Sequence, residues 1–228
     1  MKKLILTATS AIFLLGNGAA MAQAAAPPAV QTVSALEQEI GGLQTEWAHI
    51  KYEVPDEDAQ IKQMQALSQK AASTTARYPD KAEPKIWEAI IVSSQAGLKG
   101  GLGALGLVRH ARDLLVESLK IDPAALQGSA YTSLGSLYYQ VPRWPIGFGD
   151  KGKARAYLEQ ARAINPTGID PNYFYGDYLI DQGEYAKAIP VLQLALQAPA
   201  RPNRQVADAG RRKEIQEAIA LAQKKLDN

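Results

Sequence analysis

The chain has 228 residues, of which 46% are hydrophobic and none is cysteine. Because no disulfide can form, the fold must rest on an apolar core, which a chain of this length can bury. Basic and acidic residues nearly balance, with 25 Lys and Arg against 23 Asp and Glu. This balance argues against general nucleic-acid binding, which requires a basic excess.

Residues 1–22 have the pattern of a cleaved export signal. Two lysines precede a largely apolar stretch at 4–15, and the segment Ala20 to Ala22 fits the small-residue cleavage pattern. The alternative is a buried N-terminal helix; a membrane span would need a longer apolar run. We therefore expect a soluble periplasmic protein that is not a lipoprotein, since no cysteine follows the cleavage site. Cleavage would leave 25 − 2 = 23 basic residues against 23 acidic ones.

The remainder of the chain divides into a short linker and one helical domain. Residues 23–34 are rich in alanine and proline, and we expect them to be disordered. Over residues 35–228, Ala, Leu, Gln, Lys and Glu dominate, alternating strand-like runs are absent, and Pro, Gly and Asp recur at intervals of roughly 12–20 residues. This pattern predicts an all-α fold, and none of its segments is apolar enough for stable membrane insertion.

The clearest unit is residues 171–199, which we expect to form two antiparallel helices. Gly176 and Ala188 are small, so the two helices can approach closely, and Leu192 would fill the space beside them. Gly183 would end the first helix, where φ must turn positive.

This unit resembles the tetratricopeptide repeat (TPR), whose consensus has small, aromatic and bulky residues at fixed positions. The matching residues are Gly176, Leu179, Gly183, Tyr185, Ala188, Leu192, Ala195 and Pro199. The same phase recurs in residues 131–166 and 87–123, each interrupted by extra residues, and 36–78 are a degenerate pair. The resemblance implies a TPR-like α-solenoid of antiparallel helix pairs with long inserts, closed by a polar-faced capping helix at 207–226.

The long inserts also resemble those of the TPR proteins associated with tripartite (TRAP) periplasmic transporters, the T-component family. That resemblance implies helix pairs around a central opening. Members of that family are typically lipoproteins, so the missing cysteine departs from their pattern.

Two glycine-rich strings look like nucleotide-binding motifs. The G-x-G-x-x-G at 101–106 lacks a preceding strand, so we interpret it as a loop between helices. The P-loop-like string at 147–154 ends in Ala154, where a Ser or Thr would have to reach Mg²⁺. We expect Asp150 to cap a helix there instead.

Catalytic and metal-binding patterns are missing from the sequence. The two histidines, His49 and His110, have no neighbours at metal-ligand spacing, and no nucleophile motif occurs. We therefore expect neither an enzyme, nor a metal site, nor a cofactor. A catalytic pair of carboxylates is the alternative that the sequence leaves open.

The most distinctive segment is the loop at 138–150, with several aromatic residues, one arginine and two prolines. Tyr, Trp and Arg often dominate binding interfaces, so we take Tyr139, Arg143, Trp144 and Phe148 as candidate binding residues. The alternative is that Trp144 and Phe148 form a small core under the loop. Downstream, Asp170 followed by proline predicts a helix start with Asp170 as the N-cap.

The TPR resemblance also implies which residues line the concave face. In TPR domains, positions 5, 9 and 12 of each unit usually point there. The corresponding residues are Thr132, Ser136 and Tyr139, then Tyr173, Asp177 and Ile180, with Glu88, Val92 and Gln95 continuing the row. Of these, we add Thr132, Ser136, Tyr173 and Asp177 to the candidate binding residues. A row used only for packing between repeats is the alternative.

These observations favour a periplasmic scaffold or adaptor that binds a protein or peptide through its concave face and the aromatic loop. The alternative function is that of a small-molecule-binding component associated with a periplasmic transporter. An enclosed pocket would favour the second.

Overall fold

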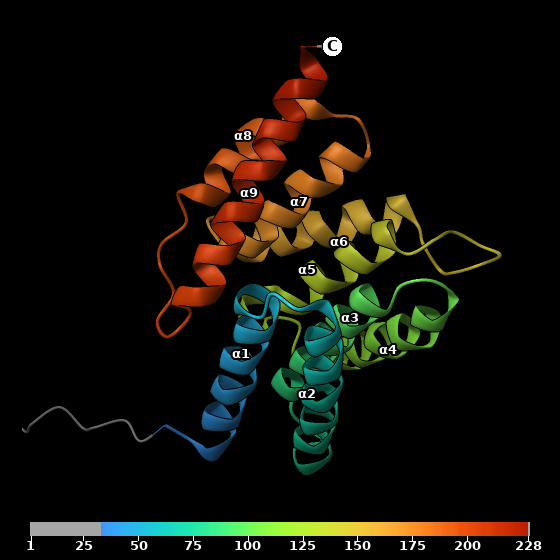
Figure 1. Ribbon diagram of the computed structural model, residues 1–228, viewed down its shortest axis with the longest axis vertical. Helices are drawn as coiled ribbons and strands as arrows, with labels where there is room; N and C mark the ends of the chain where they lie inside the picture. The colour runs from blue at the N-terminus through green and yellow to red at the C-terminus, as the bar shows by residue number, and fades with distance from the viewer. Residues whose placement is uncertain (1–32, 228) are drawn as a thin grey trace, which may run out of the picture. The chain divides into compact units, whose positions relative to one another are not determined.

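The computed structural model describes residues 33–227; the predicted export signal and nearly all of the predicted linker lie outside this range. The described part folds into helices, with no strand beyond one isolated bridge between Arg143 and Gly149, so the expectation of an all-α chain is confirmed. Its α-helices (Figure 1) are α1 (Ala35–Glu53), α2 (Glu57–Arg77), α3 (Ala82–Lys99), α4 (Leu105–Ile121), α5 (Ala125–Gln140), α6 (Lys151–Ile164), α7 (Ile169–Asp181), α8 (Tyr185–Leu196) and α9 (Gln205–Leu226). Among them, none is both long and apolar enough to cross a membrane.

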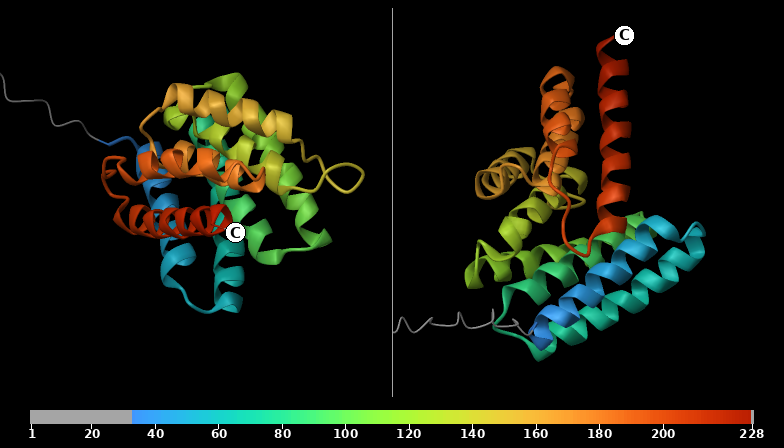
Figure 2. Two further views of the ribbon diagram at one scale, coloured as in Figure 1. Left: turned by 90° about the horizontal axis from the view of Figure 1, so that it is seen from above. Right: turned by 90° about the vertical axis from the view of Figure 1, so that its left-hand side faces the viewer.

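The helices pack in neighbouring pairs along the chain. The most extensive contacts join α3 with α4, α5 with α6, α2 with α3, and α7 with α8, and α1 also packs on α2. The last helix, α9, contacts α8, α7 and α1, and Figure 2 shows that only its beginning reaches α1. α9 therefore connects the last helix pair with the first helix.

Small residues set the spacing within two of the pairs. A Cβ atom on Gly176 of α7 would lie 2.5 Å from the Leu192 side chain of α8, and one on Gly135 of α5 would lie 2.5 Å from Leu158 of α6. Both leucines are completely buried. The prediction that Gly176 permits close approach to Leu192 is confirmed.

Helix α3 lies between two groups of buried apolar residues. Ile86 and Val92 belong to the group shared with α4 to α9, whereas Trp87 and Ile91 belong to the group formed with α1 and α2. A helix that is apolar on more than one face is buried between layers, and this position brings α3 into contact with α1, α2, α4 and α5.

The predictions for the helix ends were partly correct. Asp150 caps α6, since its Oδ1 accepts a hydrogen bond from the backbone N–H of Lys153 at 3.0 Å, and Gly183 has φ of +74° after α7. The prediction that Asp170 is an N-cap is wrong. Gly168 takes that position with extended dihedral angles, and Asp170 lies inside the first turn of α7.

Candidate binding cavity

A cavity of about 900 Å³ lies among α1, α2, α3, α4, α5 and α7 and is bordered by α9 and the segment that leads into it. We call it the central cavity. Its lining is mostly apolar and includes Trp47, Met64, Trp87, Ile90 and Phe174. Pockets that bind small organic molecules have volumes of about 300–1,000 Å³ and are lined largely by apolar residues.

Helix α3 runs the length of the central cavity and defines its two ends. Trp87 and Leu98 both line it, and they are 98 − 87 = 11 residues apart on one helix. At a rise of 1.5 Å per residue, this corresponds to about 16 Å. At the Leu98 end, the lining comes from Leu102, Leu105 and Ile146, so this end is apolar.

Hydroxyl groups line the side of the cavity formed by α5. Ser129, Thr132, Ser133 and Ser136 follow the spacing i, i+3, i+4 and i+7, which places them on one face of the helix. The candidate residues Thr132 and Ser136, taken from the concave-face positions, therefore both border the cavity.

The Trp87 end of the cavity carries charged residues from distant parts of the chain. Asp170 of α7 accepts hydrogen bonds from Arg201 Nη1 at 2.7 Å and from Arg211 Nε at 2.9 Å. Burial alone raises the pKa of the Asp170 carboxyl, but the charges of Arg211 and Arg201 outweigh it and hold that pKa well below its ordinary value. Asp170 is therefore ionised throughout the physiological range.

The other carboxylates of this cluster complete the pairing. Asp208 pairs with Arg201 at 2.6 Å, and Glu214 pairs with Arg211 at 2.5 Å and with Lys51 Nζ at 2.9 Å. The Arg211 guanidinium also lies over the ring of Tyr173, 4.3 Å from its centroid. These contacts tie α9 to α1 and α7.

Arg204 stands apart from this network. It lines the cavity and lies over the Trp87 ring, with its Cζ atom 5.1 Å from the centroid. Its Nε atom is buried without a hydrogen-bond partner, and the described residues offer it no carboxylate at ion-pair distance. Burial lowers the pKa of Arg204, and the charge of Arg201 lowers it further, but an arginine stays protonated at neutral pH.

Unpaired buried polar atoms are concentrated among the residues that line the cavity. Within residues 33–227, four buried side-chain nitrogen or oxygen atoms lack a partner, and three belong to residues lining the central cavity: Arg204 Nε, Trp87 Nε1 and Ser93 Oγ. By contrast, Trp47 Nε1 donates to Ser94 Oγ at 2.8 Å. Because buried polar groups are normally paired, Arg204 and Trp87 mark the Trp87 end as a place where a ligand could supply partners.

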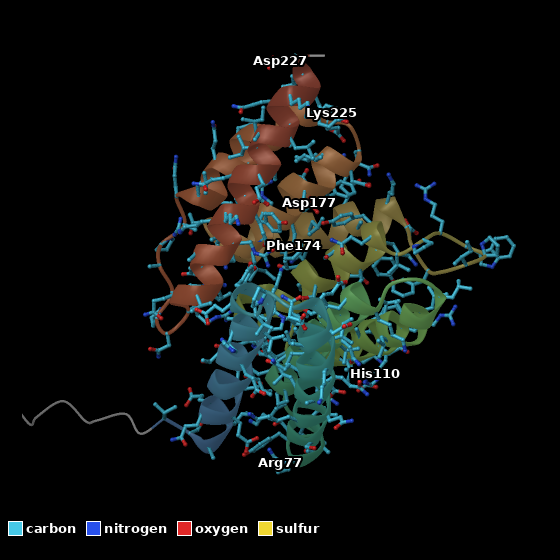
Figure 3. The ribbon with its side chains drawn as sticks, in the orientation of Figure 1. Arg77, His110, Phe174, Asp177, Lys225 and Asp227 are labelled. Atoms are coloured by element: carbon cyan, nitrogen blue, oxygen red, sulfur yellow. The ribbon has the colours of Figure 1, made fainter. Side chains whose placement is uncertain are left out.

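Tyr139 and Asp177 lie together, beside but outside the cavity lining. The Tyr139 hydroxyl donates to Asp177 Oδ2 at 2.5 Å, and burial raises the pKa of both groups. Figure 3 shows Asp177 on α7 near Phe174, which does line the cavity. Tyr173, one turn before Asp177, lines it as well. The polar-aromatic grouping expected from the repeat phase is thus present, but only Tyr173 of these three candidates borders the cavity.

The aromatic loop separates its candidate residues. The segment 141–150 projects away from the helices (Figure 1), and Trp144 in it is 86% exposed. Arg143 is also exposed. Phe148 instead packs edge-on against Tyr138, with ring centroids 5.4 Å apart. The expectation of a small core under the loop therefore describes Phe148 and not Trp144.

The sequence alone did not reveal the charged end of the cavity. The segment 201–212 contains four arginines, which was the available signal, but 207–226 was interpreted only as a polar-faced cap. Glu88 was expected on the concave face, whereas it is buried and paired with His110 Nε2 of α4 at 2.9 Å. No group of three or more His, Asp or Glu suited to a metal ion occurs in the part of the chain that the structure describes.

The fold and the cavity define a protein of paired helices that border a ligand-sized space. No known protein family matches the chain, and no curated protein sequence is similar to it.

Proposed function

We propose that this chain is a binding protein that holds a small organic molecule in the central cavity. The observation that carries the proposal is the cavity itself, because its volume of about 900 Å³ and its mostly apolar lining fit a small ligand. The hydroxyl groups of α5 would orient the ligand within it. Of the two functions that the sequence suggested, the geometry supports the small-molecule one better.

The repeat pattern and the export signal of the sequence support a place in the cell for this binding protein. The order of paired helices followed by α9 is consistent with a TPR-like solenoid, and the export signal predicted at 1–22 would deliver the protein to the periplasm. In this proposal, the protein holds its ligand in the periplasm for a partner such as a transporter, without catalysing a reaction.

We expect a bulky residue in the cavity to exclude the ligand. Ser136→Trp would place an indole ring into the space that Ser136 now borders, and native mass spectrometry of the purified protein would then show the loss of a co-purifying small molecule. Ser73→Trp is the control, since Ser73 is exposed on α2 and is not part of the lining. Retention of the same ligand by Ser136→Trp would contradict the proposal. So would a wild-type protein that is empty and whose melting temperature no added small molecule changes.

A protein or peptide partner at the aromatic loop is the second candidate function. It is favoured by Trp144, because a tryptophan that is 86% exposed contributes little to the fold and often anchors a binding partner. Trp144→Ser should change the free energy of unfolding by less than about 0.5 kcal/mol, yet abolish capture of a specific protein from a periplasmic extract. Equal capture by the wild type and the variant would exclude Trp144 as the anchor.

A further inference from the structure

The ion pairs at the Trp87 end of the central cavity leave one basic side chain over. The basic side chains there are Lys51, Arg201, Arg204 and Arg211, and the carboxylates that pair with them are Asp170, Asp208 and Glu214. Four positive charges therefore face three negative ones. Arg204 is the member without an ion pair, and one added negative charge would balance the set.

The unpaired hydrogen-bonding atoms at this end favour the same kind of partner. Arg204 Nε and Trp87 Nε1 can only donate hydrogen bonds. A group that accepts several hydrogen bonds and carries one negative charge would satisfy both. A cation or a purely apolar group would leave both unpaired.

The position of Arg204 favours a planar anion. The Trp87 ring beneath the guanidinium, with the Cζ atom 5.1 Å from the ring centroid, limits how the guanidinium can turn. The guanidinium fork matches the two oxygens of a carboxylate. Arg204 is the only one of the four basic side chains without an ion pair, so a monocarboxylate fits better than a dianion.

The lining at the opposite end of the cavity indicates that the remainder of the ligand is apolar. About 16 Å along α3 from Trp87, the lining is formed by Leu98, Leu102, Leu105 and Ile146. Leu102 and Ile146 are 78% and 51% exposed there, so the apolar body of a bound ligand would cover them from water. The cavity is thus polarised along α3, with a cation at one end and leucines at the other.

We infer that the natural ligand is an amphiphilic monocarboxylate whose carboxylate binds Arg204 beside Trp87 and whose apolar body extends towards Leu98. This inference rests on the proposed small-molecule function and specifies the chemical class of the ligand.

The test compares probes that share one apolar chain. Decanoate, decanol and decyl phosphate are titrated calorimetrically into wild-type protein freed of co-purified ligand, and into Arg204→Gln and Arg143→Gln. We expect decanoate to bind the wild type more tightly than the other two probes do. Arg204→Gln should weaken decanoate binding about 10- to 100-fold, because a charge-assisted hydrogen bond is lost, and should leave decanol binding unchanged. Arg143→Gln is the matched control, since Arg143 is exposed and outside the lining.

Each other outcome overturns a defined part of the inference. Equal binding of decanoate and decanol to the wild type would exclude recognition of an anion, and tighter binding of decyl phosphate would assign the head group to a phosphate. Unchanged decanoate binding by Arg204→Gln would exclude Arg204. In all three cases the cavity still binds a ligand, so the proposed function stands.

Absence of binding by all three probes overturns the carboxylate inference, and the mass spectrometry of wild type and Ser136→Trp then decides separately on the proposed function. If Arg204→Gln does not fold, Arg204→Lys, which keeps the charge but not the fork, should bind decanoate more weakly than the wild type does.

Discussion

Replacing Arg211 by alanine should lower the free energy of unfolding by about 3 kcal/mol. The Arg211 side chain is only 7% exposed and pairs with Asp170 of α7 and Glu214 of α9. Removing it leaves two partly buried carboxylates with fewer partners and also removes its contact with the Tyr173 ring. Because Glu214 in turn holds Lys51 of α1, the loss loosens the junction of three helices. Urea denaturation followed by circular dichroism measures the change.

A neighbouring residue supplies the control for this experiment. Lys213→Ala changes a basic residue on the same helix, but Lys213 is exposed, so its effect should stay within about 0.5 kcal/mol. If Arg211→Ala is as stable as Lys213→Ala, the ionic cluster does not stabilise the fold.

The effect of Arg211→Ala should also depend on pH. The pKa of Asp170 is depressed in the folded protein, so its contribution is complete above the unfolded-state value of about 3.9 and is lost as the pH falls towards the folded-state value. The difference between the wild type and Arg211→Ala should therefore be constant near neutral pH and decrease only below about pH 4.

Gly176→Ala should cost about 1–3 kcal/mol of stability through overpacking. The new Cβ atom would lie 2.5 Å from Leu192, whose side chain is completely buried and cannot move aside freely. Gly42→Ala is the matched control, because Gly42 is also helical but its Cβ would meet no atom within 4 Å. There, the helix preference of alanine should add about 0.5–1 kcal/mol. Thermal or urea unfolding of both variants measures the two effects.

The same pair of residues allows a check by double substitution. In a Leu192→Ala background the clash is absent, so Gly176→Ala should cost nothing there or become stabilising. If Gly176→Ala destabilises equally in both backgrounds, Leu192 is not the cause, and the close approach of α7 and α8 does not depend on this contact.

The local features of the fold could be predicted from the sequence. The helical composition, the Asp150 cap, the positive φ at Gly183 and the close contact of Gly176 with Leu192 each depend on residues near in sequence or in one pair of neighbouring helices. The spacing of the repeat-like pattern also predicted that Tyr139 and Asp177, which are 38 residues apart, lie near each other, and the two are hydrogen-bonded. A pattern that recurs along the chain can relate residues of different helices.

The charged end of the cavity was decided only by the tertiary structure. Asp170 has the sequence context of an N-cap, yet its partners Arg201 and Arg211 lie 31 and 41 residues away in the chain and belong to no repeat position. Whether an arginine is paired depends on which carboxylates the packing of α9 against α1 and α7 brings within about 4 Å. Arg204 has no carboxylate within that distance because Asp208 and Asp170 are held by the other two arginines. The sequence determined the helices, and the packing of the last helix determined which arginine was left without an ion pair.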